Sequence, residues 1–139
     1  MFFNKDNINK NDQSYLIKIT ALLIHAAKID EKYSDKEEKI IKKTLLDLGE
    51  NENELENLIS KAKHIEKNAN QILDFTKEIK NLKEIDKIKI IKSLWRIIYS
   101  DKEADMYETN LMRRLAGLLY IDSKTMGDIK EQIKKENSQ

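Results

Sequence analysis

The stretch SDKEADMYE, Ser100 to Glu108, carries four acidic residues in nine positions and follows an apolar run that ends IIYS. A related stretch, IDEKYSDKE from Ile29 to Glu37, follows another apolar run, which ends HAAK. In both places apolar residues with helical spacing stop, acids follow, and a second set with helical spacing begins. The sequence therefore predicts the same arrangement twice: a helix, an acidic turn and another helix.

Helical spacing extends along nearly the whole chain. Apolar residues recur at i, i+3, i+4 and i+7, as Leu16, Ile19 and Leu23 do, so that they lie on one face of a helix. Such stripes occupy residues 15–26, 40–48, 55–62, 72–79, 88–98, 111–119 and 126–133. No segment alternates with a period of two, and the chain contains no proline and only three glycines. We predict an all-α single domain of about seven helices with short connections.

Composition narrows the class of protein further. A chain of 139 residues has the size of one domain. Lys and Arg total 26 against 25 Asp and Glu, a near balance that argues against a nucleic-acid binder. The absence of Cys excludes disulfides, thiolate metal sites and Cys nucleophiles. Because the sequence shows no targeting segment and no apolar run near the roughly 18 residues of a membrane span, we expect a soluble, cytoplasmic protein.

The two halves of the chain repeat each other at an offset of 71 residues, the separation of Asp30 and Asp101. At this offset apolar residues meet apolar residues on both sides of the acidic turns, as Leu23 meets Leu94. The pairs that register in and just after the turns are Asp30 with Asp101, Ser34 with Asp105, and Glu37 with Glu108. Because the apolar stripes and the acids match together, we predict an internal duplication with pseudo-two-fold symmetry.

The duplication defines the expected domain organisation. Residues 1–12, which are rich in Asn and Lys, are predicted to form a flexible N-terminal tail. The helical domain then covers residues 13–136, with repeat halves at about 13–67 and 83–136. A short helix from about Asn70 to Asn81 is expected to link the two halves.

Acids at a turn can bind a cation or only start a helix. Hard cations such as Ca²⁺ and Mg²⁺ take several carboxylate, carbonyl and water oxygens, which a helix end followed by acids can supply. Capping alone also favours acids there, most clearly at Ser34 and Glu37, which have capping-box spacing. The second turn is not an EF-hand, because Met106 and Met112 occupy the positions where that loop requires Gly and Glu. The spacing alone leaves both interpretations open.

Together these motifs resemble the TerB (tellurite-resistance protein B-like) family. The segments that carry the resemblance are AAKID (26–30) and SDKEE (34–38) in the first half, and LWRIIYSD (94–101), DMYE (105–108) and LMRR (111–114) in the second. The resemblance extends from about Tyr15 to Lys134. It implies an all-helical, two-fold repeated fold, divalent cations bound at the acidic turns, and a role in tellurite resistance and stress responses. Part of a membrane-anchored DnaJ co-chaperone shares this family's fold.

The candidate metal ligands follow from the turns and from the resemblance. They are Asp30, Ser34 and Glu37 in the first half and Asp101, Asp105 and Glu108 in the second. The expected cation is Ca²⁺ or Mg²⁺. The family's glycine after each turn Asp is here Glu31 in the first half and Lys102 in the second. Because the charge of Lys102 should weaken a cation site beside Asp101, we expect a cation to favour the first half.

Three interpretations of function are open at this stage. The first is a TerB-like cytoplasmic stress-response module that binds divalent cations at the acidic turns and acts through a protein partner. The second is a metal-free helical interaction or co-chaperone-like domain whose acids only cap helices. The third is a metal-dependent enzyme, but neither His25 nor His64 has the Glu of a di-iron motif before it, and no nucleophile–base arrangement appears. We therefore expect that the protein is not an enzyme. We also expect Trp95 to be buried between the two repeats.

Overall fold

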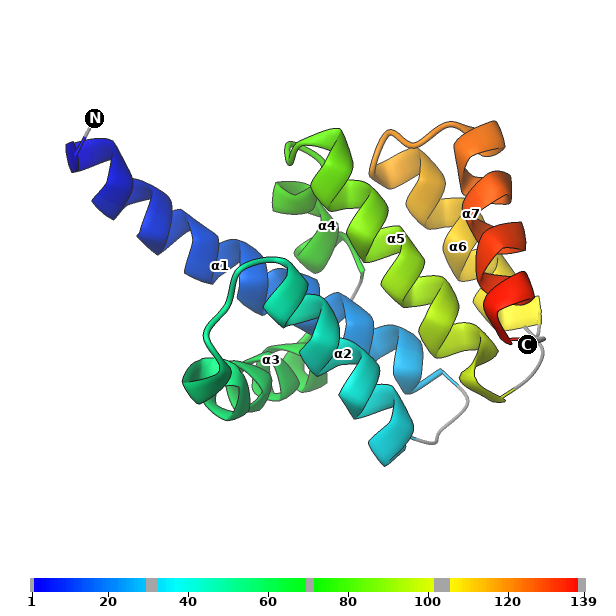
Figure 1. The fold of residues 1–139 in the computed structure, drawn as a ribbon, viewed down its shortest axis with the longest axis horizontal. Helices are drawn as coiled ribbons and strands as arrows, with labels where there is room; N and C mark the ends of the chain where they lie inside the picture. Colours follow the sequence, from blue (N-terminus) through cyan, green and yellow to red (C-terminus); the bar gives the residue numbers. More distant parts are fainter. Residues whose placement is uncertain (1, 30–32, 70–71, 102–105, 138–139) are drawn as a thin grey trace.

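The computed structural model contains seven α-helices and two short 3₁₀ helices, and no strand, in the part of the chain that it describes (Figure 1). That part is residues 2–29, 33–69, 72–101 and 106–137, with side chains from Tyr15 onward and without that of Asp101. The elements are α1 (Phe2–Ala27), α2 (Asp35–Asp47), η1 (Glu52–Glu54), α3 (Leu55–Asn68), α4 (Leu73–Ile79), α5 (Glu84–Ile98), η2 (Tyr99–Asp101), α6 (Met106–Leu118) and α7 (Ser123–Asn137). The all-α prediction is confirmed, and α4 is the predicted short linking helix.

Helices α1 and α5 form the centre of the bundle. α1 packs against α2, α3, α4 and α5, and α5 packs in addition against α2 and α7 (Figure 1). Because neighbours surround it, α1 is buried on all sides from Ile19 to Ile24. The polar residue in this segment, Thr20, donates its hydroxyl hydrogen to the carbonyl of Leu16 at 2.6 Å. The buried apolar side chains form one cluster, as expected of a single domain.

The first part of α1 lies outside this core. The helix begins at Phe2, and its N-terminal part projects beyond the other helices (Figure 1). The helix therefore includes residues 2–12, which we predicted to be part of a flexible tail. That this segment is flexible stays a prediction.

In several pairs of apolar residues at the 71-residue offset, both members are buried. Ile41 and Met112 are both in the core, and so are Leu55 and Met126. The order of long helices is also the same in the two halves, α1–α2–α3 and α5–α6–α7. These similarities support the duplication, which stays a prediction.

Helices α2 and α6 end in the same way. Gly49 follows α2 with φ +103°, and the N–H of Glu50 donates to the carbonyl of Leu45 at 3.0 Å. After α6, the N–H of Ile121 donates to the carbonyl of Ala116 at 2.9 Å. These six-residue closures are Schellman motifs, which need a left-handed residue just past the helix. Gly49 is that residue after α2, where glycine adopts the conformation without a steric cost.

Gly49→Ala is expected to lower the free energy of unfolding by about 1 kcal/mol. A Cβ at Gly49 would meet no atom within 4 Å, so the cost is that of the left-handed backbone alone. Gly127 is the matched control, because it lies inside α7 and a Cβ there also meets no atom within 4 Å. Urea denaturation should show Gly127→Ala stabilised by about 0.5–1 kcal/mol. If both substitutions changed the free energy of unfolding equally, the left-handed backbone at Gly49 would not be what makes Ala costly there.

Candidate site at the acidic turns

The first acidic turn ends in a complete capping box at the start of α2. The Glu37 N–H donates to Ser34 Oγ at 3.2 Å, and Glu37 Oε1 accepts from the Ser34 N–H at 2.8 Å. Ser34 Oγ also lies 3.0 Å from the same carboxylate oxygen, to which it can donate its hydrogen. The predicted capping box is therefore confirmed, and both the hydrogen and one lone pair of the Ser34 hydroxyl are used within it.

A buried glutamate lies in the first turn of the helix that follows each acidic turn. Glu37 is 2% exposed in α2, and Glu108 is 6% exposed in α6. The two residues are equivalent at the 71-residue offset. A carboxylate rarely leaves water unless other groups compensate its charge, and helix N-termini do so in part. The structure thus holds one desolvated carboxylate beside each turn.

Described residues that flank the two acidic turns are in contact, since α2 and η2 are joined by a hydrogen bond. Lys36, in the first turn of α2, donates its ammonium to the carbonyl of Ser100 in η2 at 3.0 Å. The Ser100 hydroxyl donates to the carbonyl of Ile97 at 2.6 Å and so closes the end of α5. The Lys36 side chain, which follows the first acidic turn, therefore already binds a backbone oxygen that precedes the second acidic turn.

The structure describes three of the six predicted ligands. Asp30, Asp105 and the side chain of Asp101 lie outside the described residues. Ser34 and Glu37 come together in the capping box, and Glu108 is buried in the second half. Among the described residues, no three His, Asp or Glu side chains gather closely enough to hold a metal ion. The complete ligand set stays a prediction.

A family model described as "Tellurite resistance protein TerB" matches residues 16–131. The chain belongs to the TerB family. The match runs from α1 to α7 and includes both acidic turns, so it confirms the resemblance drawn from the turn motifs. Neither a search of curated proteins nor a search of solved structures gave a match. No helix in the described part of this TerB-family chain is long and apolar enough to cross a membrane.

In this TerB-family domain a charged network that the sequence analysis missed lies beside the first turn. The Tyr33 hydroxyl donates to Glu38 Oε1 at 3.1 Å, and the ammonium of Lys63 lies 3.5 Å from that oxygen and 5.1 Å from the centre of the Tyr33 ring. Lys42 lies 3.6 Å from Glu38 Oε2 and 2.6 Å from Glu56. The network joins the turn to α2 and α3. Sequence spacing could have suggested the i,i+4 pair of Glu38 and Lys42, but not the contact with α3.

This network shifts the titration of its members. Burial, followed by the charge of Glu38, raises the pKa of the Tyr33 hydroxyl. Burial also opposes ionisation of Glu38, but the hydrogen bond from Tyr33 and the charges of the neighbouring lysines outweigh it and lower the pKa of the Glu38 carboxyl. The contribution of Glu38 to stability is therefore present above its unfolded pKa and is lost as the pH falls through the folded pKa.

His25 has a structural partner in the TerB-family bundle. Its Nδ1 lies 3.2 Å from Glu66 Oε2, and Lys28 donates to Glu66 Oε1 at 2.8 Å. These contacts join the end of α1 to the end of α3. His25 is half-buried at this contact.

Trp95 is 3% exposed, so its predicted burial is confirmed, while its position between the two repeats stays a prediction. Its ring stacks on Tyr99 of η2 with centroids 5.7 Å apart, and the ammonium of Lys130 lies 5.6 Å from it. Both partners belong to the second half, so these contacts place the ring beside η2 and α7. The indole Nε1 is buried and has no hydrogen-bond partner among the described residues.

Proposed function

We propose that this TerB-family protein is a non-catalytic module of a tellurite-resistance-type stress response, which binds a divalent cation at its acidic turns and acts through a protein partner. The buried carboxylate beside each turn carries this proposal. Glu37 and Glu108 are desolvated at equivalent positions, next to turns whose sequence adds Asp30 and Asp101. A cation would offset the repulsion among these acids and would take their oxygens as ligands.

The first turn is the better cation site in this proposal. In the second turn the Ser100 carbonyl, a helix-end oxygen of the kind that hard cations use, already accepts a hydrogen bond from Lys36. The sequence adds a further positive charge there at Lys102, whereas the first turn has Glu31 at the equivalent position. Both features lower the affinity of the second turn for a cation relative to the first.

Millimolar Ca²⁺, Mg²⁺ or Mn²⁺ is expected to raise the Tm of the chelator-stripped protein. A cation at 100 times its Kd stabilises the native state by about 2.7 kcal/mol, which corresponds to a rise on the order of 10 °C. Asp30→Asn should remove most of the rise, and Asp101→Asn should remove less of it. The matched control is Glu84→Gln, which neutralises an exposed acid at the start of α5 and should leave the rise unchanged.

Glu37→Gln separates the two roles of this glutamate. Gln also serves at this position of a capping box, so the substitution keeps the hydrogen bonds and removes the charge. If the cation dependence of Tm is lost and the Tm without cation is nearly kept, Glu37 acts as a ligand. A Tm that no cation moves, in the parent protein and in Asp30→Asn with Glu37→Gln alike, would refute cation binding.

The capping box itself favours a second candidate function, a metal-free helical interaction or co-chaperone-like domain. Ser34 and Glu37 satisfy each other's hydrogen-bonding groups and cap the start of α2. This capping alone explains why both residues occur there. In this case the acids fix the turns and the partner binds elsewhere on the bundle. The same melting experiment decides between the candidates, because only the first requires cation-dependent stability.

A further inference from the structure

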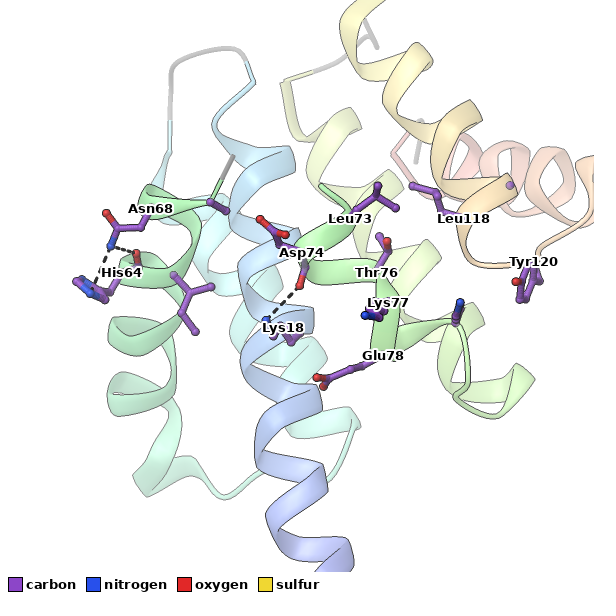
Figure 2. A pocket seen from close by; sticks show the side chains of 14 residues that line it. Lys18, His64, Asn68, Leu73, Asp74, Thr76, Lys77, Glu78, Leu118 and Tyr120 are labelled. Atoms are coloured by element: carbon purple, nitrogen blue, oxygen red, sulfur yellow. Dashed lines mark hydrogen bonds between the residues drawn. The ribbon is translucent and has the colours of Figure 1, made fainter. Parts of the chain in front are cut away.

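A cavity of about 930 Å³ lies over α4, away from the predicted cation ligands. Figure 2 shows His64 and Asn68 of α3 on one side of α4, and Leu118 and Tyr120, at the end of α6, on the other. Part of the lining is apolar and includes Leu73, which is 42% exposed. The volume lies in the range of sites that enclose several side chains or a small ligand.

The lining of this cavity contains three lysines and two acids. Lys18, Lys77 and Lys80 line it, and Lys87 lies next to it with its ammonium 5.8 Å from the centre of the Tyr120 ring. None of these four ammoniums forms an ion pair within the described part of the chain. The carboxylates among the lining residues come from α4 itself, at Asp74 and Glu78. The lysines therefore outnumber the acids at this surface, which favours an anionic partner.

Tyr120 is held at the rim of the cavity in a costly conformation. Its φ is +58°, in the left-handed region that favours glycine, and Gly49 occupies the equivalent position after α2. The ring is 69% exposed, with Lys80 and Lys87 within 6 Å of its centre, at 5.9 and 5.8 Å. A glycine would end α6 without this strain. Strained residues concentrate at binding sites, where the surroundings maintain them for a purpose other than stability.

We propose that this cavity docks an acidic, amphipathic segment of a partner protein. Apolar side chains of the segment would pack on Leu73, Leu118 and the Tyr120 ring, while its carboxylates would pair with Lys77 and Lys80. In protein interfaces the buried apolar anchors usually supply most of the affinity, and the charged rim around them supplies specificity. The inference deepens the proposed function, since it assigns the partner's site and chemistry, but it requires no cation.

The test is fluorescence anisotropy of the full chain with a fluorescein-labelled peptide of Glu-Glu-Leu-Leu repeats, in chelator. The parent protein should bind this peptide, and added salt should weaken the binding. Lys77→Glu with Lys80→Glu should weaken it by about tenfold or more. The matched control is Lys39→Glu with Lys135→Glu, an equal charge change at exposed lysines that do not line the cavity, which should change Kd by less than about twofold.

Tyr120→Gly provides a second test, in which the expected changes of Tm and of peptide binding differ from those of a misfolded variant. It should raise the Tm, because the strain is relieved, and should also weaken peptide binding by about fivefold or more, because the ring is lost. The proposal is overturned if the peptide fails to bind at about 1 mM protein, or if a peptide with Ser in place of Leu binds equally well. Equal weakening by the Lys39 and Lys135 control would overturn it too. Because chelator is present throughout, loss of the cation effect leaves this test intact, and loss of peptide binding leaves the cation test intact.

Discussion

Trp95→Ala is expected to lower the free energy of unfolding by about 3–5 kcal/mol. The indole is the largest side chain of α5 and lies buried against η2 and α7, where it stacks on Tyr99. Its removal leaves a cavity in the contact between two helices and takes away the ring that supports η2. Urea denaturation followed by circular dichroism measures the change. A loss below about 1 kcal/mol would mean that the ring does not support this contact.

Trp95→Phe is the matched variant, and it should cost less than about 1.5 kcal/mol. The indole N–H has no hydrogen-bond partner among the described residues, so replacing it removes a buried polar group that stabilises nothing. Phe keeps an aromatic face toward Tyr99 and loses only part of the packed volume. If Phe destabilised the protein as much as Ala does, the N–H would have to make a contact that the structure does not contain.

The helices could be predicted from the sequence because their signals are local. The apolar stripe of residues 88–98 lies within α5, and the Ser34–Glu37 pair marks the start of α2 as expected. Each signal depends on residues within about one turn of one another, which a single sequence displays. The family resemblance was recoverable for the same reason, since its motifs lie in short segments beside the turns.

The arrangement around the turns could not be predicted from such signals. The hydrogen bond from Lys36 to the Ser100 carbonyl joins residues 64 positions apart, and that from Lys18 to the Asp74 carbonyl joins residues 56 apart. Periodicity indicates which face of a helix is buried but not which helix covers it. The burial of Glu37 and Glu108 could not be predicted from the sequence either, because the same residue spacing also fits an exposed helix cap.

Tyr120 shows a different reason for failure. The sequence after α6 contains no glycine where α2 has Gly49, so it gives no sign that the backbone turns left-handed there. The helix ends with the same hydrogen bonds in spite of a local backbone preference worth about 1 kcal/mol against this conformation. Positions of this kind tend to be functional, since nothing in the local sequence requires them.

Phe75→Ala is expected to have an effect as large as that of Trp95→Ala, about 3–5 kcal/mol, for a different reason. α4 has seven residues, Leu73–Ile79, too few to form a stable helix alone, so its structure depends on packing. Phe75 and Ile79 are fully buried on its inner face, and α4 packs on α1 and α6. The Phe75 ring also contacts that of His25 on α1, with centroids 6.4 Å apart. Without this ring α4 loses its largest anchor.

The consequence reaches the cavity over α4, because α4 provides its centre. Amide hydrogen exchange should show α4 losing protection in Phe75→Ala while α1 and α5 keep theirs, and the acidic peptide should bind less tightly. Phe75→Leu is the control: it keeps an apolar anchor of similar length and should cost less than about 1.5 kcal/mol. If Phe75→Ala unfolded the whole bundle together, α4 would be part of the common folding unit rather than a helix docked upon it. If it cost less than about 1 kcal/mol, burial of the Phe75 ring would not be what holds α4 in place.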